Sequence, residues 1–246
     1  MPHCVFYCST SGCTLLLGTA LGINFLADIE DIETLEKRAK RKKLAEHQVF
    51  YLSSFDFFPF LKAIKHQELQ LLADKEYPEL EHARQEKRIK QRFHDLYQPV
   101  QIHIFDRAGG PLFKMLNCHL DPVIPMRWNR FGSFDEFPPS PLNIRGFDIE
   151  LYDSLQFFVP FFRNRAGSHV NFNDLPSADY YVMVFWNDYY KRPSRKLLRK
   201  LRKSFMKLKD KNIAFLFVNN HNAFVWNNFR VQAQQKRIKE SRAPLF

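Results

Sequence analysis

The sequence predicts an α/β fold built on a β-α-β unit that follows a β-hairpin. Two apolar runs, residues 181–185 and 213–218, flank a basic amphipathic stretch. This is the pattern of two strands that are buried in a parallel sheet and joined by a helix. Upstream, residues 100–105 alternate apolar and polar side chains, which favours a strand. We expect three regions: an apolar anchor or signal segment in 1–27, a helical region in 28–98 and an α/β domain in 99–246.

The N-terminal region contains a long uncharged stretch. Residues 4–27 carry no charged side chain, and their apolar centre is TLLLGTALGINFLA. A membrane-spanning helix needs about 20 mostly apolar residues. This stretch has three interpretations: a membrane anchor, an export signal, or a buried or irregular segment that results from a wrongly assigned start of the chain. Residues 10–13 (TSGC) loosely resemble the box before a lipidated cysteine, but the apolar run follows Cys13 instead of preceding it.

Residues 28–97 have a charged, helical pattern. Apolar residues such as Ile89, Phe93 and Leu96 recur at three- and four-residue spacing, and Pro59 and Pro78 interrupt the pattern. We therefore expect two or three helices in this region. The basic cluster 37–43 (KRAKRKK) lies close to the apolar stretch, and the positive-inside rule favours a cytoplasmic side for it.

The pattern of residues 100–145 predicts a hairpin followed by an ordered loop. The glycine-containing turn 106–111 (DRAGGP) joins 100–105 to a second apolar run in 112–120, as in a β-hairpin. The loop 121–145 is expected to be ordered because it carries four large aromatic residues, and short helices are expected around 154–158 and in 224–239. The four aromatic residues of the loop 121–145 are Trp128, Phe131, Phe134 and Phe137. The chain as a whole has 26 Phe, which we interpret as a Phe-rich core.

The helix of the β-α-β unit is predicted to be strongly amphipathic. Its apolar stripe consists of Leu197, Leu198, Leu201, Phe205 and Leu208, and Lys and Arg occupy much of the remaining surface. Pro193 suits the first turn of a helix, and Ser194 suits a helix-capping position. No His and acid that could activate Ser194 as a nucleophile are recognisable, and we assign no catalytic residue.

This part of the chain resembles the membrane-tethered thioredoxin-like (redoxin-domain) proteins, in which a strand ending in Phe-Trp leads into Cys-x-x-Cys-Arg-Lys and a helix. Phe185-Trp186 match the strand end. The sequence Pro-Ser-Arg-Lys at 193–196 matches the family's Pro-Cys-Arg-Lys, with Ser194 in place of the second cysteine, and Tyr190 falls near the first. The hairpin with Asp106 and two following glycines is similar to the family's Asp-x-x-Gly hairpin.

The resemblance covers about residues 100–120 and 179–222 and implies a thioredoxin-like core that needs no cofactor. The corresponding turn is degenerate: it contains Trp186, Tyr190, Pro193 and Ser194 but no cysteine. Thiol exchange requires a thiolate nucleophile, so the resemblance implies a redox-inactive domain. The family's tethered members face outward from the cell, which conflicts with the cytoplasmic side favoured by the basic cluster 37–43. The side of the membrane therefore stays open.

Positive charge is concentrated in the C-terminal part of the chain. Residues 188–242 contain sixteen Lys or Arg and three acidic residues, whereas the whole chain has a net charge of +11. A field of this kind attracts anionic partners. The candidate anion-binding residues lie around the start of the predicted helix: Lys191, Arg192, Arg195, Lys196 and Arg199. Aromatic residues that could stack on bases are sparse in this helix, which disfavours nucleic acid relative to acidic lipid.

The cysteines and histidines suggest no metal site. Three of the four Cys precede residue 14, and Cys118 is the fourth, so the α/β domain has no disulfide framework and no Cys/His cluster with zinc spacing. Cys118 is expected to be a small buried hydrophobic residue. The sequence thus favours a membrane-anchored binding or scaffolding module of the cell envelope with a protein partner. The alternative is an anion-binding protein that uses the basic helix 191–211.

Overall fold

A six-stranded mixed sheet forms the centre of the computed structural model, which describes residues 28–45, 48–53, 55–116, 128–129, 132–139 and 153–227. The strands lie in the order β3-β2-β5-β6-β1-β4. Their bounds are β1 Val49–Leu52, β2 Gln101–Asp106, β3 Pro111–Leu116, β4 Phe162–Arg163, β5 Tyr180–Trp186 and β6 Ile213–Asn219. The predicted α/β class is confirmed.

The predicted β-α-β unit is present. Strands β5 and β6 are parallel along their whole length, with Tyr180 opposite Ile213 and Trp186 opposite Asn219. The helix α6 (Lys191–Ser204) connects them. The predicted hairpin is also confirmed: β2 pairs antiparallel with β3 on one side and with β5 on the other.

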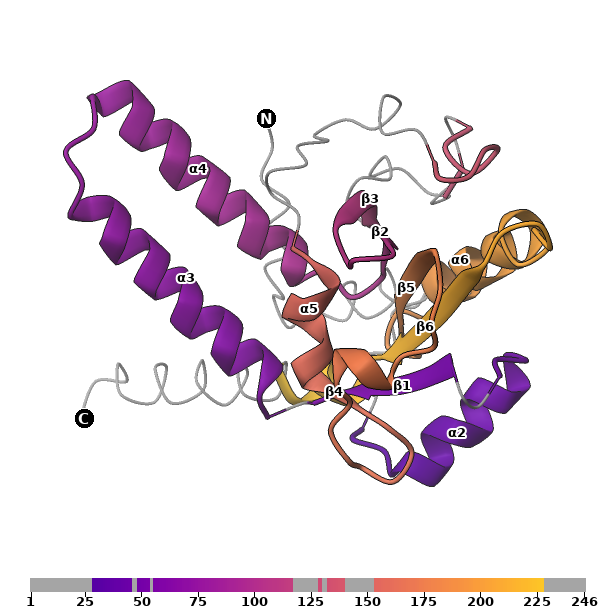
Figure 1. Cartoon of the computed structure of the whole chain (residues 1–246). Coiled ribbons are helices and arrows are strands. Elements are labelled where there is room, and N and C mark those ends of the chain that lie inside the picture. The colour runs from indigo at the N-terminus through magenta and orange to yellow at the C-terminus, as the bar shows by residue number, and fades with distance from the viewer. Residues whose placement is uncertain are drawn as a thin grey trace, which may run out of the picture.

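Three helices precede the hairpin, which agrees with the two or three predicted. They are α2 (Ile32–Arg41), α3 (Phe57–Ala73) and α4 (Glu79–Leu96). Pro78 occupies the N-cap of α4, and Pro59 lies in the first turn of α3, where a missing N–H leaves no hydrogen bond unmade. Helices α3 and α4 form an antiparallel pair that projects from the sheet (Figure 1).

The region predicted to be helical also supplies a strand that the sequence analysis missed. Strand β1 lies between α2 and α3, runs parallel to β6 and is antiparallel to β4. Its four residues, VFYL, are all buried. A four-residue apolar run is too short to distinguish a strand from a helical segment by periodicity. Residues 28–98 therefore contribute to the same sheet as the C-terminal part.

The helices cover both faces of the sheet. One core contains side chains of α3, α4 and α5 (Leu155–Phe158) against β5 and β6. The opposite core contains side chains of α2 and α6 against the same strands. Ten Phe are among the largest fully buried side chains of the described residues, which confirms the Phe-rich core: Phe57, Phe93, Phe105, Phe113, Phe134, Phe158, Phe162, Phe185, Phe205 and Phe217.

Several other predictions can be compared with the structure. Trp128 and Phe134 of the aromatic loop are buried, at 3% and 2% exposure. The short helix near 154–158 is α5, which continues into a 3-10 turn. The predicted last helix begins by residue 221, and its part beyond 227 lies outside the described residues. The described residues also exclude the apolar stretch 4–27, Cys13, Cys118 and Phe131. In the described ranges, no helix is long and apolar enough to cross a membrane.

Candidate anion-binding site

The turn that leaves β5 is held by one buried asparagine. The Asn187 side chain accepts a hydrogen bond from the Tyr190 backbone N–H (2.6 Å). Its amide group donates to the carbonyl of Pro99 (2.9 Å) and to the side-chain oxygen of Asn220 (2.8 Å). These bonds connect the ends of β5 and β6 to the start of β2. They fix the position at which α6 begins, at the carboxyl edge of the parallel strands.

Ser194 does not cap α6, so that prediction is wrong. The helix starts three residues earlier, at Lys191, and the N-cap residue is Tyr190, whose side chain does not cap the helix. Ser194 is fully buried, and its hydroxyl accepts a hydrogen bond from the Asn187 backbone N–H (3.1 Å). Its role is therefore to join the turn to the first turn of the helix. Pro193 is the third helical residue, in the first turn as predicted.

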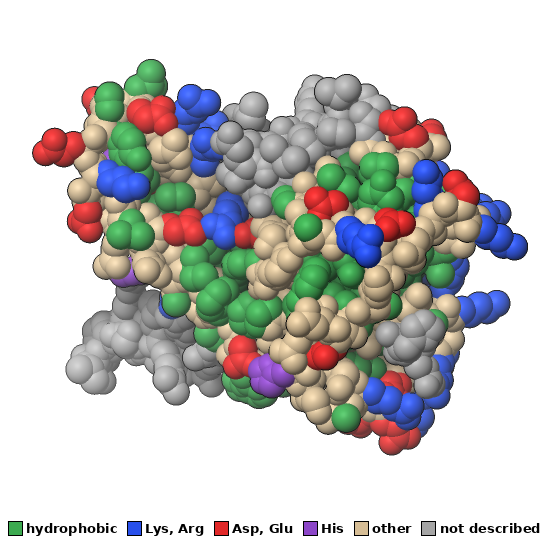
Figure 2. Space-filling model, in the orientation of Figure 1, with side chains coloured by type: hydrophobic (Ala, Val, Ile, Leu, Met, Phe, Trp, Pro, Cys, Tyr) green, Lys and Arg blue, Asp and Glu red, His purple; other side chains and the backbone are tan. Residues whose placement is uncertain are grey.

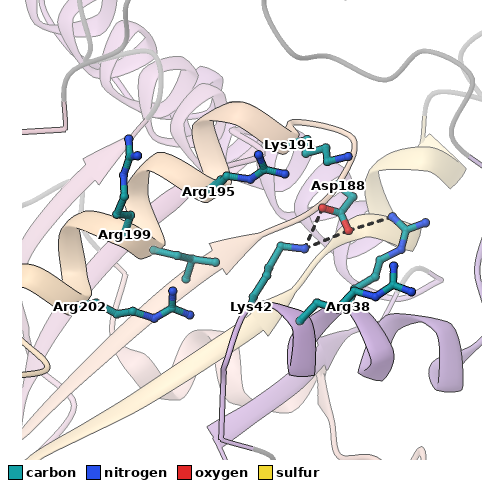
Figure 3. A pocket seen from close by; sticks show the side chains of 9 residues that line it. Arg38, Lys42, Asp188, Lys191, Arg195, Arg199 and Arg202 are labelled. Carbon is teal, nitrogen blue, oxygen red and sulfur yellow. Dashed lines mark hydrogen bonds and ion pairs between the residues drawn. The ribbon is translucent and has the colours of Figure 1, made fainter.

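A basic pocket of about 630 Å³ lies between α2 and α6, and we call it the α2–α6 groove. Figure 3 shows the α6 side chains along one wall and those at the end of α2 along the other. In the space-filling view, Lys and Arg gather along the edge over α6 (Figure 2). The lining residues are Arg38, Arg41, Lys42, Asp188, Lys191, Arg195, Leu198, Arg199 and Arg202.

Asp188 joins the two walls of the groove. Its carboxylate accepts hydrogen bonds from Arg38 (2.9 Å) and from Lys42 (2.9 Å). Arg38 also pairs with Glu30, and the Lys42 ammonium lies 4.6 Å from the centroid of the Trp186 ring. The Asp188 side chain is only 9% exposed. Ion pairs of this kind need good geometry to offset desolvation, and here two cations share one carboxylate.

Burial and charge shift the pKa values of the paired groups in the groove. Burial raises the pKa of Asp188, but the attraction of Lys42 and Arg38 and their hydrogen bonds outweigh it and hold the pKa below its ordinary value. Burial lowers the pKa of Lys42, and repulsion from Arg38 and Arg195 adds to this, so that the attraction of Asp188 does not restore it. The low pKa of Asp188 therefore reflects its two cationic neighbours, whereas the low pKa of Lys42 reflects mainly its burial.

Most of the positive charge in the groove has no carboxylate partner. Glu30 and Asp188 pair with Arg38 and Lys42. Five further cations line the groove, and none has an ion pair with an acidic residue within the described ranges: Arg41, Lys191, Arg195, Arg199 and Arg202. One guanidinium nitrogen of Arg202 is buried and has no hydrogen-bond partner among the described residues. Buried donors are nearly always satisfied, so this nitrogen can donate to an acceptor on a ligand or on water.

The structure brings together only some of the predicted site residues. Lys191, Arg195 and Arg199 line the groove, whereas Arg192 and Lys196 do not. Trp186, Tyr190, Pro193 and Ser194 form the turn and the helix start and lie outside the lining. The sequence analysis missed the α2 wall. Its signal was the basic cluster 37–43, which was interpreted only as a membrane-orientation signal.

A second polar cluster lies beside the groove. His221 is fully buried after β6, and its Nε2 lies 3.1 Å from the carbonyl of Asp28. Burial lowers the pKa of His221, although the nearby Glu30 carboxylate opposes this. Among the residues that the structure describes, no group of His, Cys, Asp and Glu could hold a metal ion.

Comparison of the chain with protein-family models, with curated proteins and with solved structures gave no match in any of the three. Function therefore has to be argued from the geometry and charge of the groove.

Proposed function

We propose that this protein binds an anionic partner in the α2–α6 groove. The observation that carries the proposal is the charge of the lining: seven Lys or Arg and a single carboxylate. That carboxylate already pairs with two of the seven. Like charges that face one another across a cavity raise the free energy of the empty site, and a bound anion relieves this repulsion.

The position of the groove also supports a binding role. In open α/β sheets, ligands bind outside the carboxyl ends of parallel strands. The groove begins there, because Asp188 follows β5 by two residues and Lys191 starts α6. The partial positive charge at a helix N-terminus adds to the field of the side chains.

A matched pair of charge reversals tests the anion-binding proposal. The double variant Arg195→Glu/Arg199→Glu changes the groove, whereas Lys203→Glu/Lys207→Glu changes exposed positions of the same chain segment by the same net charge. We expect the groove variant to elute from immobilised heparin at a much lower salt concentration than the wild type, and the control variant to elute close to it. Equal effects of the two variants would show attraction by overall charge only.

A second candidate function is that of a membrane-anchored, redox-inactive thioredoxin-like module that scaffolds a protein partner in the cell envelope. One observation favours it: the hairpin β2–β3 flanks the β5–α6–β6 unit, and the degenerate turn lies where β5 leads into α6. In this candidate, residues 4–27 form the anchor. The two functions are compatible, because the scaffold could present the groove.

Two experiments test this second candidate. The variant Lys191→Cys/Ser194→Cys places two thiols in the first turn of α6. We expect an intramolecular disulfide in a folded domain, and a folded variant that stays reduced under oxidant would contradict the local likeness.

A reporter active on one side of a membrane, fused after Glu46 and at the C-terminus, should give the same side for both fusions. Opposite sides, or a soluble fusion, would contradict an anchor in 4–27.

A further inference from the structure

The two walls of the groove carry cations at regular spacing. On α6, Lys191, Arg195, Arg199 and Arg202 follow one another at three or four residues, which is about 4.5 to 6 Å per step at a rise of about 1.5 Å per residue. At the C-terminal end of α2, Arg38, Arg41 and the C-cap residue Lys42 lie within about one turn. A ligand that satisfies both walls must carry several negative groups separated by a few ångströms.

Arginine predominates among these cations. Five of the seven are Arg and two are Lys. The planar guanidinium offers two parallel N–H donors that match the oxygens of a phosphate group, whereas an ammonium acts as a point charge. Arg202, at the far end of the α6 row, has a buried guanidinium nitrogen with no hydrogen-bond partner within the part of the chain that the structure describes. These features favour phosphate groups over single carboxylates.

The described residues of the lining provide no surface for stacking a base. Leu198 is the one apolar side chain among the nine described lining residues, and none of the nine is aromatic. Single-stranded nucleic acid binds through aromatic stacking as well as through backbone charge. The groove volume of about 630 Å³ is typical of sites for small molecules. Recognition is therefore expected to depend on phosphate groups in a compact ligand.

From these observations we infer that the ligand of the α2–α6 groove is a compact molecule bearing several phosphate groups, held between the α2 wall and the α6 wall. This inference rests on the proposed anion-binding function. The same chemistry is offered by a soluble polyphosphorylated molecule and by the phosphorylated headgroup of a membrane lipid. Asp188 acts as a positioning residue, because it holds Arg38 and Lys42 toward the α6 wall.

Calorimetric titration of the full chain with inositol hexakisphosphate tests the inference. We expect saturable binding with one molecule per chain. Arg41→Glu on α2 and Arg199→Glu on α6 should each weaken binding about tenfold or more, and Lys203→Glu should stay within about twofold of the wild type. Asp188→Asn should reduce affinity while a one-to-one stoichiometry is kept. A loss in Arg199→Glu without a loss in Arg41→Glu would overturn the two-wall site.

Two further arms identify the source of the phosphate groups and separate this inference from the proposed function. Phosphatidylcholine vesicles with phosphatidylinositol 4,5-bisphosphate should bind and be displaced by inositol hexakisphosphate if the source is a lipid. Binding of the soluble probe alone supports a soluble source. A single-stranded 20-nucleotide DNA that binds through the groove more tightly than the probe would overturn the compact ligand but keep the anion-binding function. No groove-dependent binding of any of the three would overturn both.

Discussion

Asp188 is the residue on which the arrangement of the groove depends. It is nearly buried, and its carboxylate binds Arg38 from α2 and Lys42 just after α2. The two cations lie about 150 positions away in the sequence, so one carboxylate connects the N-terminal helix to the end of β5. Nothing in the local sequence around Asp188 identified this role, because an acid after a strand is ordinary turn chemistry.

We predict that Asp188→Asn lowers the free energy of unfolding by about 1–3 kcal/mol at pH 7, since it leaves two partly buried cations without their carboxylate. Chemical denaturation measures this. The exposed Asp179→Asn serves as the control, and it should change the free energy by less than about 0.5 kcal/mol. Equal effects of the two substitutions would contradict the ion-pair account.

The same carboxylate predicts a pH dependence. Its pKa is lower in the folded than in the unfolded chain, so its contribution to stability is complete above the unfolded pKa of about 3.9. The contribution is lost as the pH falls through the folded pKa. We expect the stability difference between wild type and Asp188→Asn to shrink as the pH is lowered below about 4. A difference that stays constant down to pH 2 would contradict the assignment.

Ser194 offers a second test at the residue scale. Its buried hydroxyl is the hydrogen-bond partner of the Asn187 backbone N–H. We predict that Ser194→Ala costs about 1–3 kcal/mol of folding stability, because that buried N–H loses its acceptor. Ser204→Ala, in the last turn of α6, is the matched control and should be nearly neutral. Thermal or urea unfolding of the three proteins measures the difference, and a neutral Ser194→Ala would rule out this role.

Among the elements, those with strong local patterns were predictable. The hairpin, strands β5 and β6, and helices α3, α4 and α6 follow from alternation, apolar runs, helical spacing and the position of proline. Strand β1 could not be predicted, because its identity as a strand comes from pairing with β6 and β4. The predicted basic helix 191–211 starts where α6 starts but extends seven residues beyond its end at Ser204. The capping role expected of Ser194 was wrong, because the turn bonds made by Asn187 fix the helix start and the sequence shows only a plausible cap at Ser194.

The hairpin β2–β3 provides a prediction at the element scale. Gly109 has a φ of +85°, and a Cβ atom there would lie 2.5 Å from the side-chain oxygen of Gln156. Gly167 has a similar φ of +78° but nothing within 4 Å of such an atom. The contacting atoms are the amide end of the exposed Gln156 side chain, which can move aside, so we expect Gly109→Ala and Gly167→Ala to destabilise the protein by similar amounts, about 1 kcal/mol of backbone strain each. A loss in Gly109→Ala that exceeds the loss in Gly167→Ala by more than about 1 kcal/mol in urea unfolding would contradict this.

At the scale of the whole molecule, the groove is assembled from segments far apart in the chain. The basic character of α6 was visible in the sequence, and three of its five candidate anion-binding residues line the groove. The facing wall was not predictable. The cluster 37–43 has a helical pattern that buries Leu35 and Ala39, but only the packing of α2 beside α6 against one face of the sheet turns two separate basic helices into one cavity.

Amide hydrogen exchange of the full chain, with and without inositol hexakisphosphate, tests the central claim most directly. If the ligand lies between the two helices, exchange should slow in residues 32–43 and in 191–204 together, while the β2–β3 hairpin at the far edge of the sheet stays unchanged. Protection of only one helix, or protection centred outside both, would contradict a binding site formed by the α2–α6 groove.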